Sequence, residues 1–471
     1  MRSQISRAIK SLVDVEPHER LKLFLLTVAF FFVIAAYTIA KELKDSIFVA
    51  IVGQLYLPAA KLWTMVALVP AILLYAKLVD KMRRYHLLAF YSSAYALLGL
   101  VFAYFLGHPT IGIPNTDTNP YRIFGWVVYF FVEGYSPFVV SVFWAFANSI
   151  NDPESAKKNY GLMVSGSKLG GMLSAGLAWM ILANIGPFKT LAVTDTSKHQ
   201  LLLGISSALL AVVPFVIFYL QRTVSGRYLH GYEAAYKVEK QRSKEGESST
   251  GVLAGFKMLV KYPYVFGIFC IILFYEMIHT VLSFQRVTIA RQGAESVAQV
   301  SSFLFKIVFV THFIGFFISL IGTRYLLKRF GEKLCLMFVP VSTVLAFLYF
   351  KISGTQIAFL GFYVAIRSIN YAFSYPVRES LYIPTVKEIK FKSKSWIDAF
   401  GTKFAKFSGM FFNYITYGWS PGAFAQAQTG FFSLVMGVWF VAAYMLGLRF
   451  ERAIFNNEVI GSDPEPQAKT S

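Results

Sequence analysis

The sequence predicts an all-α membrane protein with about twelve transmembrane helices in two groups of six. Three observations lead to this prediction. The 471 residues are 56% hydrophobic and only 15% charged, whereas soluble domains are nearer ~25% charged. Apolar runs of about 18 residues or more recur from near Leu21 to near Gly447, as is typical of membrane-spanning helices. One long hydrophilic stretch interrupts these runs near the middle of the chain.

The apolar runs fall into two groups along the chain. The first group comprises spans near residues 22–40, 62–79, 87–106, 123–148, 160–186 and 200–220. The second comprises spans near residues 264–290, 299–323, 334–351, 355–375, 399–418 and 424–448. Six spans, a linker and six spans are the arrangement expected of a major-facilitator-like bundle with pseudo-two-fold symmetry. We therefore expect an N-terminal bundle over 1–220, a cytoplasmic linker over 221–256, a C-terminal bundle over 257–450 and a cytoplasmic tail over 451–471.

The charge balance is strongly positive. The 45 Lys and Arg residues outnumber the 25 Asp and Glu residues, which gives a formal net charge of +20. Such an excess can indicate nucleic-acid binding, but the hydrophobicity of this chain favours the lipid bilayer as its environment. When loops are assigned to alternating sides, most Lys and Arg residues fall on the side of the N-terminus. Because positively charged loops stay in the cytoplasm, both termini and the linker are predicted to be cytoplasmic.

An internal repeat supports two related halves. The turn after the second span reads AKLVDKMRRYHLL, and the turn after the eighth reads TRYLLKRFGEKLCL. The fifth span opens YGLMVSGSKLGG and the eleventh opens WIDAFGTKFAKFSG, each an aromatic residue followed by small residues and a lysine. Repeats of this kind predict a substrate site on the pseudo-two-fold axis between the halves.

Charged residues inside the first-half spans are candidates for function. A charge at the centre of a spanning helix costs about 2.5–3.5 kcal/mol on insertion scales, so such residues usually serve a purpose. Lys44 and Asp45 end the first span, Glu133 lies well inside the fourth, and Lys168 lies in the fifth. The alternative interpretation for Lys44 and Asp45 is an interfacial helix end. For Glu133, and likewise for Glu276 in the seventh span, it is a structural ion pair with Lys168 or Arg286. The glycines around Lys168 favour close helix packing.

The second half contains more cations than carboxylates within its spans. Glu276 lies in the seventh span, and His279 follows it at i, i+3, where it could relay protons or serve as a packing residue. Arg378 lies near the end of the tenth span, and Lys403 and Lys406 share one face of the eleventh. Lys306 and Arg367 add two further internal cations. A net positive site in a low-dielectric surrounding attracts anions, and these side chains suit phosphate.

Motifs of soluble enzymes are missing from the sequence. It contains no GxxxxGK followed by Ser or Thr and no HExxH. The two cysteines, Cys270 and Cys335, lie in separate apolar runs, so neither a disulfide framework nor a Cys-rich metal site is expected. We therefore expect a protein that is not an enzyme and needs no cofactor or metal.

Four stretches together show a family resemblance. YTIAKELKDSIFVA resembles the first-span signature of the nucleotide transporter (ATP/ADP translocase) family of obligate intracellular bacteria and plastids. VEGYSPFVVSVFWAFANSINDPESAKKNYGL resembles its fourth span, and YEMIHTVLSFQ its seventh. YPVRESLYIPTVKEIKFKSKSWIDAFGTKFAKFSG resembles its tenth and eleventh spans, with Arg378 in place of the family's lysine. Arginine keeps the charge but changes the hydrogen-bond geometry.

The resemblance implies a secondary carrier in the bacterial inner membrane, working as a monomer by alternating access. It would exchange ATP for ADP, with inorganic phosphate as a further substrate, or import nucleotides with protons. The family's important charges would fall on Lys44, Glu133 and Glu276. We expect a substrate site made of Lys44, Glu133, Lys168, Glu276, Arg378, Lys403 and Lys406. Coupling to ions is assigned to Asp45, Glu133, Glu276 and His279.

Three other functions have to be weighed. A carrier of the same fold could transport another organic anion, such as a sugar phosphate or a dicarboxylate. A membrane-embedded enzyme would need a carboxylate pair near an interface, which only Glu42 and Asp45 approximate. A multidrug exporter is disfavoured because its cavity is usually apolar or acidic.

Overall fold

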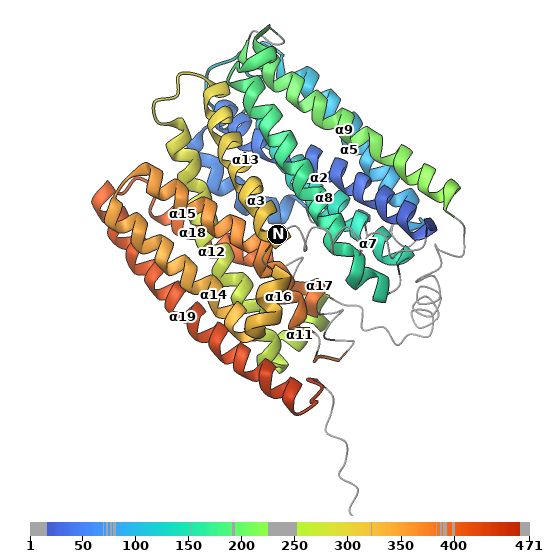
Figure 1. Ribbon diagram of the computed structural model, residues 1–471. Coiled ribbons are helices and arrows are strands. Elements are labelled where there is room, and N and C mark those ends of the chain that lie inside the picture. Colours follow the sequence, from blue (N-terminus) through green and yellow to red (C-terminus); the bar gives the residue numbers. More distant parts are fainter. Residues whose placement is uncertain are drawn as a thin grey trace, which may run out of the picture. The chain divides into compact units, whose positions relative to one another are not determined.

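Over the residues that it describes, the computed structural model of the chain is mainly α-helical (Figure 1). It describes residues 17–68, 70–71, 74–75, 78, 82–151, 153–190, 194–224, 252–321, 323–382, 384–386, 389, 393–397 and 401–461. Over these residues the only β-type pairing is an isolated bridge between Thr385 and Ile460. Most of the predicted linker lies outside the described residues, so its boundaries stay a prediction.

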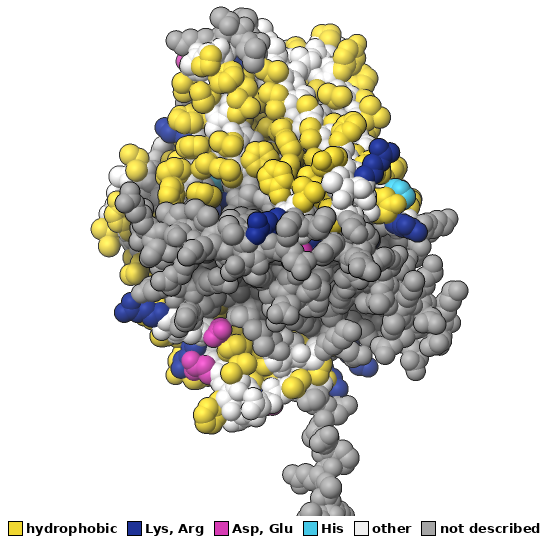
Figure 2. All heavy atoms as spheres, turned by 45° about the vertical axis from the view of Figure 1, so that its right-hand side comes forward, with side chains coloured by type: hydrophobic (Ala, Val, Ile, Leu, Met, Phe, Trp, Pro, Cys, Tyr) yellow, Lys and Arg dark blue, Asp and Glu magenta, His cyan; other side chains and the backbone are white. Residues whose placement is uncertain are grey.

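Eight helices in the described part of the chain are long and apolar enough to cross a membrane. They are Glu19–Ile51, Arg84–Leu106, Ile123–Ala147, Asp195–Thr223, Pro263–Arg291, Val297–Ile318, Arg329–Ser353 and Pro421–Phe455. Hydrophobic side chains cover most of the described surface in the upper part of Figure 2. A hydrophobic exterior of this extent fits lipid rather than water. The chain is a multi-pass membrane protein.

The chain divides into two compact units. Unit 1 comprises Met1–Ser248 and Val287–His312, and unit 2 comprises Ser249–Arg286 and Phe313–Ser471. Helices α12 (Pro263–Arg291) and α13 (Val297–Ile321) therefore each contribute residues to both units. The segment Val287–His312, here called the α12–α13 hairpin, packs with unit 1 although it follows the predicted linker in sequence.

Helix α2 (Pro17–Ile51) is central to unit 1 and packs against α8 (Pro153–Leu182) and α9 (Asp195–Thr223). Two glycines of α8 permit this close approach. A Cβ atom at Gly170 would lie 2.6 Å from the carbonyl oxygen of Phe31, and one at Gly166 would lie 2.4 Å from Cγ2 of Thr27. The packing role predicted for the glycines around Lys168 is thereby confirmed.

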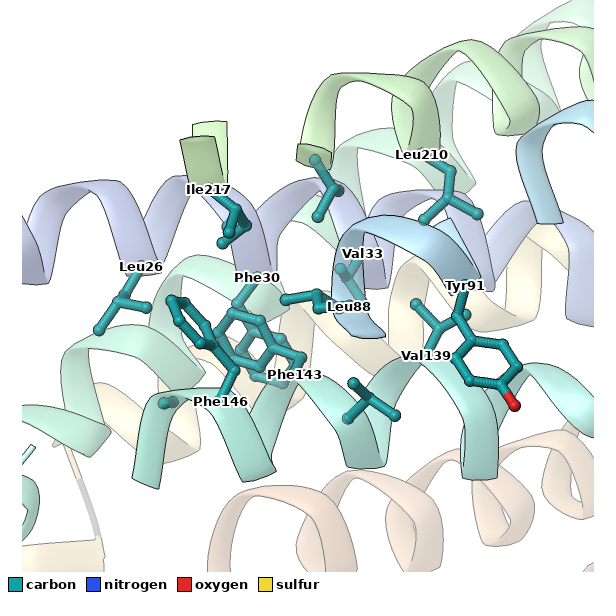
Figure 3. Close-up of a cluster of buried hydrophobic side chains, with 14 of the residues drawn as sticks. Leu26, Phe30, Val33, Leu88, Tyr91, Val139, Phe143, Phe146, Leu210 and Ile217 are labelled. Carbon is teal, nitrogen blue, oxygen red and sulfur yellow. The ribbon is translucent and has the colours of Figure 1, made fainter. Parts of the chain in front are cut away.

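The hydrophobic core of unit 1 joins four spans. Phe30 of α2 stacks on Phe143 of α7 (Ser141–Ile150) with ring centroids 4.5 Å apart. Leu88 of α5 (Arg84–Leu106) and Leu210 of α9 pack in the same cluster (Figure 3). Interdigitated side chains of this kind hold helices together in a bilayer, where van der Waals contact is a main attraction. Unit 1 also contains η1 (Gln54–Tyr56), α3 (Leu57–Ala67) and η3 (Gly186–Thr190).

Unit 2 is assembled around α14 (Thr323–Ser353), which packs against α19 (Pro421–Phe455) and α15 (Gln356–Ile369). Helix α14 bends at Gly331, whose φ of 71° lies in a region that glycine tolerates. Helix α18 (Thr402–Ile415) packs on α12, because Gly409 brings its backbone against the carbonyl of Met277. The short elements of unit 2 are α11 (Val252–Lys261), α16 (Tyr375–Ser380) and α17 (Lys394–Trp396).

The fourth and tenth predicted spans each contain a five-residue π-helical segment. The fourth span runs through α6 (Ile123–Tyr135), the π-helical segment η2 (Ser136–Val140) and α7. The tenth span runs through α15, the π-helical segment η5 (Asn370–Ser374) and α16. Pro137 lies inside η2, and Pro376 lies just after η5. Proline removes a backbone donor, and such widened turns often occur at functional sites.

Candidate functional site

A cluster of charges in unit 1 centres on Lys44. The Lys44 Nζ atom lies 2.6 Å from Oδ1 of Asp45 and 3.1 Å from Oε1 of Glu133. It also lies 4.5 Å from the ring centroid of Tyr129, within the range of a cation–π contact. We call Lys44, Asp45, Tyr129 and Glu133 the unit 1 cluster. One cation faces two carboxylates here, so the described cluster is formally negative.

Burial explains why these four side chains stay together. The side chains of Lys44 and Asp45 are 4% and 7% exposed, so neither charge is solvated by water. An isolated buried charge is costly, and pairing recovers part of that cost. Glu133 is the most accessible member, with 24% of its side chain exposed. Glu133 is therefore the carboxylate that an incoming group can reach and displace most readily.

Lys168 lies on α8, whereas the residues of the unit 1 cluster lie on α2 and α6. It occupies α8 as a half-buried residue, between the two glycines that pack on α2. On the same helix, the ring of Trp179 lies 5.8 Å from Nζ of Lys306 on α13. Lys168 as a substrate ligand stays a prediction.

A stack of aromatic rings organises the corresponding region of unit 2. The ring of His279 on α12 stacks on Tyr275 with centroids 5.5 Å apart, and on Tyr363 of α15 with centroids 5.8 Å apart. His279 Nδ1 lies 3.8 Å from Oε2 of Glu276, which is longer than a hydrogen bond. The pair predicted at i, i+3 thus shares one helix face, with the histidine held between two tyrosines.

Two buried arginines flank Tyr363. The Cζ atom of Arg286 lies 5.0 Å from the Tyr363 ring centroid, and that of Arg367 lies 5.7 Å from it. Arg367 also donates a hydrogen bond from Nη1 to the Tyr363 hydroxyl. Arg286 is 1% exposed and Arg367 is 4% exposed. We call Glu276, His279, Arg286, Tyr363 and Arg367 the unit 2 cluster.

More accessible cations act on the same carboxylate. Lys406 of α18 and Arg378 of α16 both exert an electrostatic attraction on Glu276, with Lys406 the stronger. Lys406 is exposed, whereas Arg378 and Lys403 are half-buried. Among the described side chains named here, cations outnumber carboxylates in unit 2, the reverse of the unit 1 cluster. Accessible cations of this kind can attract an anion.

The two clusters repeat one construction. Tyr129 and Tyr363 each lie seven residues before the first residue of a π-helical segment, Ser136 or Asn370. A cation from the first or seventh span covers each ring, Lys44 in unit 1 and Arg286 in unit 2. One turn after the tyrosine, unit 1 has Glu133 and unit 2 has Arg367. The internal repeat therefore keeps a tyrosine covered by a cation in both units. The residue four positions after that tyrosine is acidic in unit 1 and basic in unit 2.

Sequence reasoning missed part of this construction. The sequence suggested Arg286 only as a structural partner of a carboxylate, and nothing in it singled out Tyr363. A signal was available in the paired prolines Pro137 and Pro376, which mark the fourth and tenth spans as equivalent. Among the described residues, no group of three or more His, Cys, Asp or Glu could hold a metal ion.

Similarity to known proteins extends over most of the chain. A family model described as TLC ATP/ADP transporter matches residues 1–118 and 119–450. The protein named ADP,ATP carrier protein 3 of Rickettsia bellii (strain RML369-C) is 23% identical over 460 residues, covering 86% of this chain and 88% of that protein. The protein named ADP,ATP carrier protein 1 of Chlamydia muridarum (strain MoPn / Nigg) is 24% identical over 442 residues, covering 84% and 82%.

Solved structures establish the fold. A D-xylose-proton symporter aligns with a TM-score of 0.59 at 11% identity, covering 92% of this chain and 97% of that one. The inward open conformation of the xylose transporter XylE from E. coli aligns with a TM-score of 0.57 at 12% identity, covering 94% and 97%. At sequence identities this low, the similarity shows the fold and nothing about the substrate. The predicted major-facilitator-like fold is confirmed.

Proposed function

The chain belongs to the TLC ATP/ADP transporter family, and on this basis we propose that it transports nucleotides across a bacterial inner membrane. Transport by alternating access fits the fold, because major-facilitator-like carriers work by rocking two helical bundles around a substrate site. We propose that the termini are cytoplasmic, as the distribution of Lys and Arg residues predicts.

The observation that carries this proposal is the accumulation of cations around one carboxylate in unit 2. Nucleotides carry several negative phosphate charges. Lys406 and Arg378 are accessible cations that attract Glu276, and Lys403 lies three residues before Lys406 on α18. Arg378 presents a planar set of donors that can bind a phosphate through two oxygens at once. We propose these three residues as phosphate ligands, with the buried Arg286 and Arg367 as additional fixed positive charge.

Unit 1 has a different part in the proposed cycle. Lys44 is already engaged by two carboxylates, so a phosphate could reach it only by displacing one of them. Glu133 is the more exposed of the two and is the one we propose to be displaced. Because Glu133 lies on α6, its release from Lys44 would couple substrate binding to a rearrangement of α6. A displaced carboxylate can also take up a proton, which would link this step to proton-coupled import.

Proteoliposomes test the proposal and separate the transport modes. Radiolabelled ATP should enter vesicles containing the purified protein, either only when they are preloaded with ADP or in response to a pH gradient. The first outcome indicates exchange, with or without added phosphate, and the second indicates proton-coupled import. Failure to move any nucleotide, or competition by sugar phosphates or dicarboxylates but not by nucleotides, would overturn the assignment.

Lys44→Ala provides the sharpest variant in this assay, because it removes the cation between the two carboxylates. We expect uptake to be abolished. Lys41→Ala is the matched control. Lys41 lies about one turn before Lys44 on α2, and its Nζ lies 5.6 Å from the centroid of the Tyr37 ring. Equal loss in both variants would argue against a specific role for Lys44.

A further inference from the structure

The chain turns back onto unit 2 directly after its last helix. Asn457, two residues beyond the end of α19, has a φ of 50°, a left-handed conformation that asparagine tolerates. Its backbone N–H donates to the carbonyl oxygen of Ile454 at 3.2 Å, and that of Glu458 donates to Ala453 at 2.8 Å. These two bonds form a Schellman motif, a common way of ending a helix. Residues 458–461, here called the C-terminal strap, follow this turn.

The C-terminal strap pairs with the segment that follows α16. Ile460 forms a parallel β-bridge with Thr385. The backbone N–H of Ile460 donates to the carbonyl oxygen of Pro384 at 2.7 Å, and its carbonyl oxygen accepts from the N–H of Val386 at 3.0 Å. Ile460 is 6% exposed. Both backbone groups of this buried residue are therefore bonded to one segment, residues 384–386, here called the receiving segment.

A close approach of the backbone at Gly461 extends this contact. Its φ of 93° lies in a region that glycine adopts readily. A Cβ atom at Gly461 would lie 2.5 Å from Cδ1 of Ile389 and 3.0 Å from Cγ2 of Val386. Ile389 is fully buried in a cluster with Leu259 of α11 and Phe269 of α12, and Val386 packs against this cluster. The C-terminal strap thus ends against a hydrophobic cluster of unit 2.

An ion pair holds the other end of the C-terminal strap. Arg449, near the end of α19, donates from Nη1 to Oε2 of Glu458 at 2.6 Å and from Nη2 to Oε1 of the same carboxylate. The two side chains are 38% and 39% exposed. The planar guanidinium fits both carboxylate oxygens at once, but exposed ion pairs contribute little stability and are screened by salt. This pair can therefore open without leaving a buried charge.

The receiving segment lies just beyond the end of α16. Tyr264 of α12 donates from its hydroxyl to the carbonyl oxygen of Leu381 at 2.7 Å. Thr385 Oγ1 donates to the carbonyl oxygen of Tyr382 at 2.8 Å, which joins the receiving segment to the same stretch. Arg378 lies on α16, three residues before Leu381. The end of α16 is therefore attached to α12 through Tyr264 and to α19 through the C-terminal strap.

We propose that the C-terminal strap is a releasable attachment that positions α16 and, through it, Arg378. The strap is held by two backbone hydrogen bonds, the buried side chain of Ile460 and one exposed ion pair. A segment with so few attachments can open locally while the rest of the unit stays folded. With the strap released, the end of α16 loses its attachment to α19, and the guanidinium of Arg378 samples more orientations.

The consequence for transport rests on the proposed function, in which Arg378 is a phosphate ligand. A mobile guanidinium loses more conformational freedom when it binds a phosphate, so release of the C-terminal strap weakens nucleotide binding. The strap acts through Arg378 and its residues are positioning residues. Its loss should therefore raise KM for the nucleotide more than it lowers kcat. The attachment of the strap to the receiving segment does not rest on the proposed function and is tested separately.

Hydrogen–deuterium exchange of the purified protein in nanodiscs tests this attachment without any nucleotide. Deleting residues 458–471 removes the acceptor of the Val386 N–H. The peptide covering residues 381–389 should then exchange about two- to tenfold faster than in the full chain, the factor expected for one net hydrogen bond. Deleting residues 462–471 is the matched control, because it shortens the chain but keeps the strap, and exchange should stay at the full-length rate. Equal exchange of this peptide in the two deletions would overturn the proposal.

Charge variants of the full-length chain guard against misfolding of the shortened one. Glu458→Gln removes the ion pair of the C-terminal strap, so the same peptide should exchange faster, and Arg449→Glu combined with Glu458→Arg should restore the slower rate. Glu451→Gln is the matched control, because Glu451 pairs with Lys333 of α14 at 3.3 Å. An equal effect of Glu458→Gln and Glu451→Gln would assign the change to lost surface charge and contradict the proposal.

Uptake kinetics test the link to Arg378. Deleting residues 458–471 should raise KM for ATP about two- to tenfold, as expected for ordering one additional side chain, with kcat near the wild-type value. In an Arg378→Gln background, the same deletion should raise KM no further, because effects that act through one side chain are not additive. Equal increases in both backgrounds would overturn the positioning role. If the protein transports no nucleotide, the proposed function fails, whereas the exchange measurements still decide whether the strap holds the receiving segment.

Discussion

Tyr129 and Tyr363 occupy the same position relative to a π-helical segment in the fourth and tenth spans, and each lies beneath a cation. Their hydroxyl groups differ. The Tyr363 hydroxyl accepts a hydrogen bond from Arg367, whereas the buried Tyr129 hydroxyl has no hydrogen-bond partner among the described residues. The repeat therefore contains two equivalent tyrosines, of which only Tyr363 makes a hydrogen bond through its hydroxyl.

Replacing each tyrosine by phenylalanine should separate these roles. Tyr363→Phe leaves a buried Arg367 N–H without its acceptor, which should lower the free energy of unfolding by about 1–3 kcal/mol. Tyr129→Phe keeps the ring under Lys44 and removes a hydroxyl that makes no hydrogen bond, so we expect a change within about 0.5 kcal/mol. Thermal melting of both variants in the same detergent measures the difference. Equal losses would show that the two hydroxyls are equivalent.

Lys44 should matter for folding as well as for transport. Lys44→Met removes the cation that contacts both Asp45 and Glu133, and removing one partner from buried ion pairs costs about 3–5 kcal/mol. The triple variant Lys44→Met, Asp45→Asn and Glu133→Gln removes all three charges and should recover most of that stability. It should still fail to transport nucleotides. Melting temperature and uptake, measured on the same preparations, distinguish the two effects.

A contrary result would be equally informative. If the triple variant transports, the charges of the unit 1 cluster serve stability alone, and the phosphate-exchange step proposed for Glu133 is wrong. Lys44→Arg tests whether the positive charge alone is sufficient, because arginine keeps the charge but changes the geometry of the hydrogen-bond donors. We expect this variant to fold like the wild type and to transport more slowly.

The sequence predicted where the helices lie better than where they end. A helix of the structure overlaps each predicted span, but the first was expected near 22–40 and α2 extends to Ile51. The charges of Lys44 and Asp45 lower the local hydropathy, yet they neutralise each other inside the protein and the helix continues. Composition along one segment cannot reveal such pairing, because Glu133, the third partner, lies on a different span.

In the candidate site, too, contacts within one helix could be predicted from the sequence, whereas contacts between helices could not. Glu276 and His279 were predicted to share a face because they are three residues apart on one helix. The contact of Arg286 with Tyr363 joins α12 to α15, and no spacing rule relates these two positions. The π-helical segments also escaped prediction, since a single widened turn leaves the apolar period of a span almost unchanged.

Helix packing in unit 1 can be tested at two glycines. Gly170→Ala places a methyl group 2.6 Å from the backbone carbonyl of Phe31, which cannot rotate away, so α2 and α8 have to separate. We expect a loss of about 1–3 kcal/mol of stability. Gly204→Ala on α9 is the control, because no atom would lie within 4 Å of the added methyl group. Since alanine favours helices by up to about 1 kcal/mol over glycine, this variant should be neutral or more stable. A similar destabilisation in both would point to a general intolerance of added volume.

Arg122 holds the loop between α5 and α6 in place. Its Nη1 donates to the carbonyl oxygens of Asp117 at 2.7 Å and Asn115 at 3.1 Å, and its Nη2 donates to that of Gly112 at 2.5 Å. The single ammonium group of lysine cannot donate to these three carbonyl oxygens with the same geometry as the planar guanidinium group. Arg122→Lys should therefore loosen the loop almost as much as Arg122→Met does, and a protease added to the purified protein should cleave both variants faster than the wild type. The loop stands outside both charge clusters, so nucleotide uptake by intact Arg122→Lys should stay near the wild-type level. Protection by lysine equal to that by arginine would show that charge alone, rather than the geometry of the guanidinium, secures the loop.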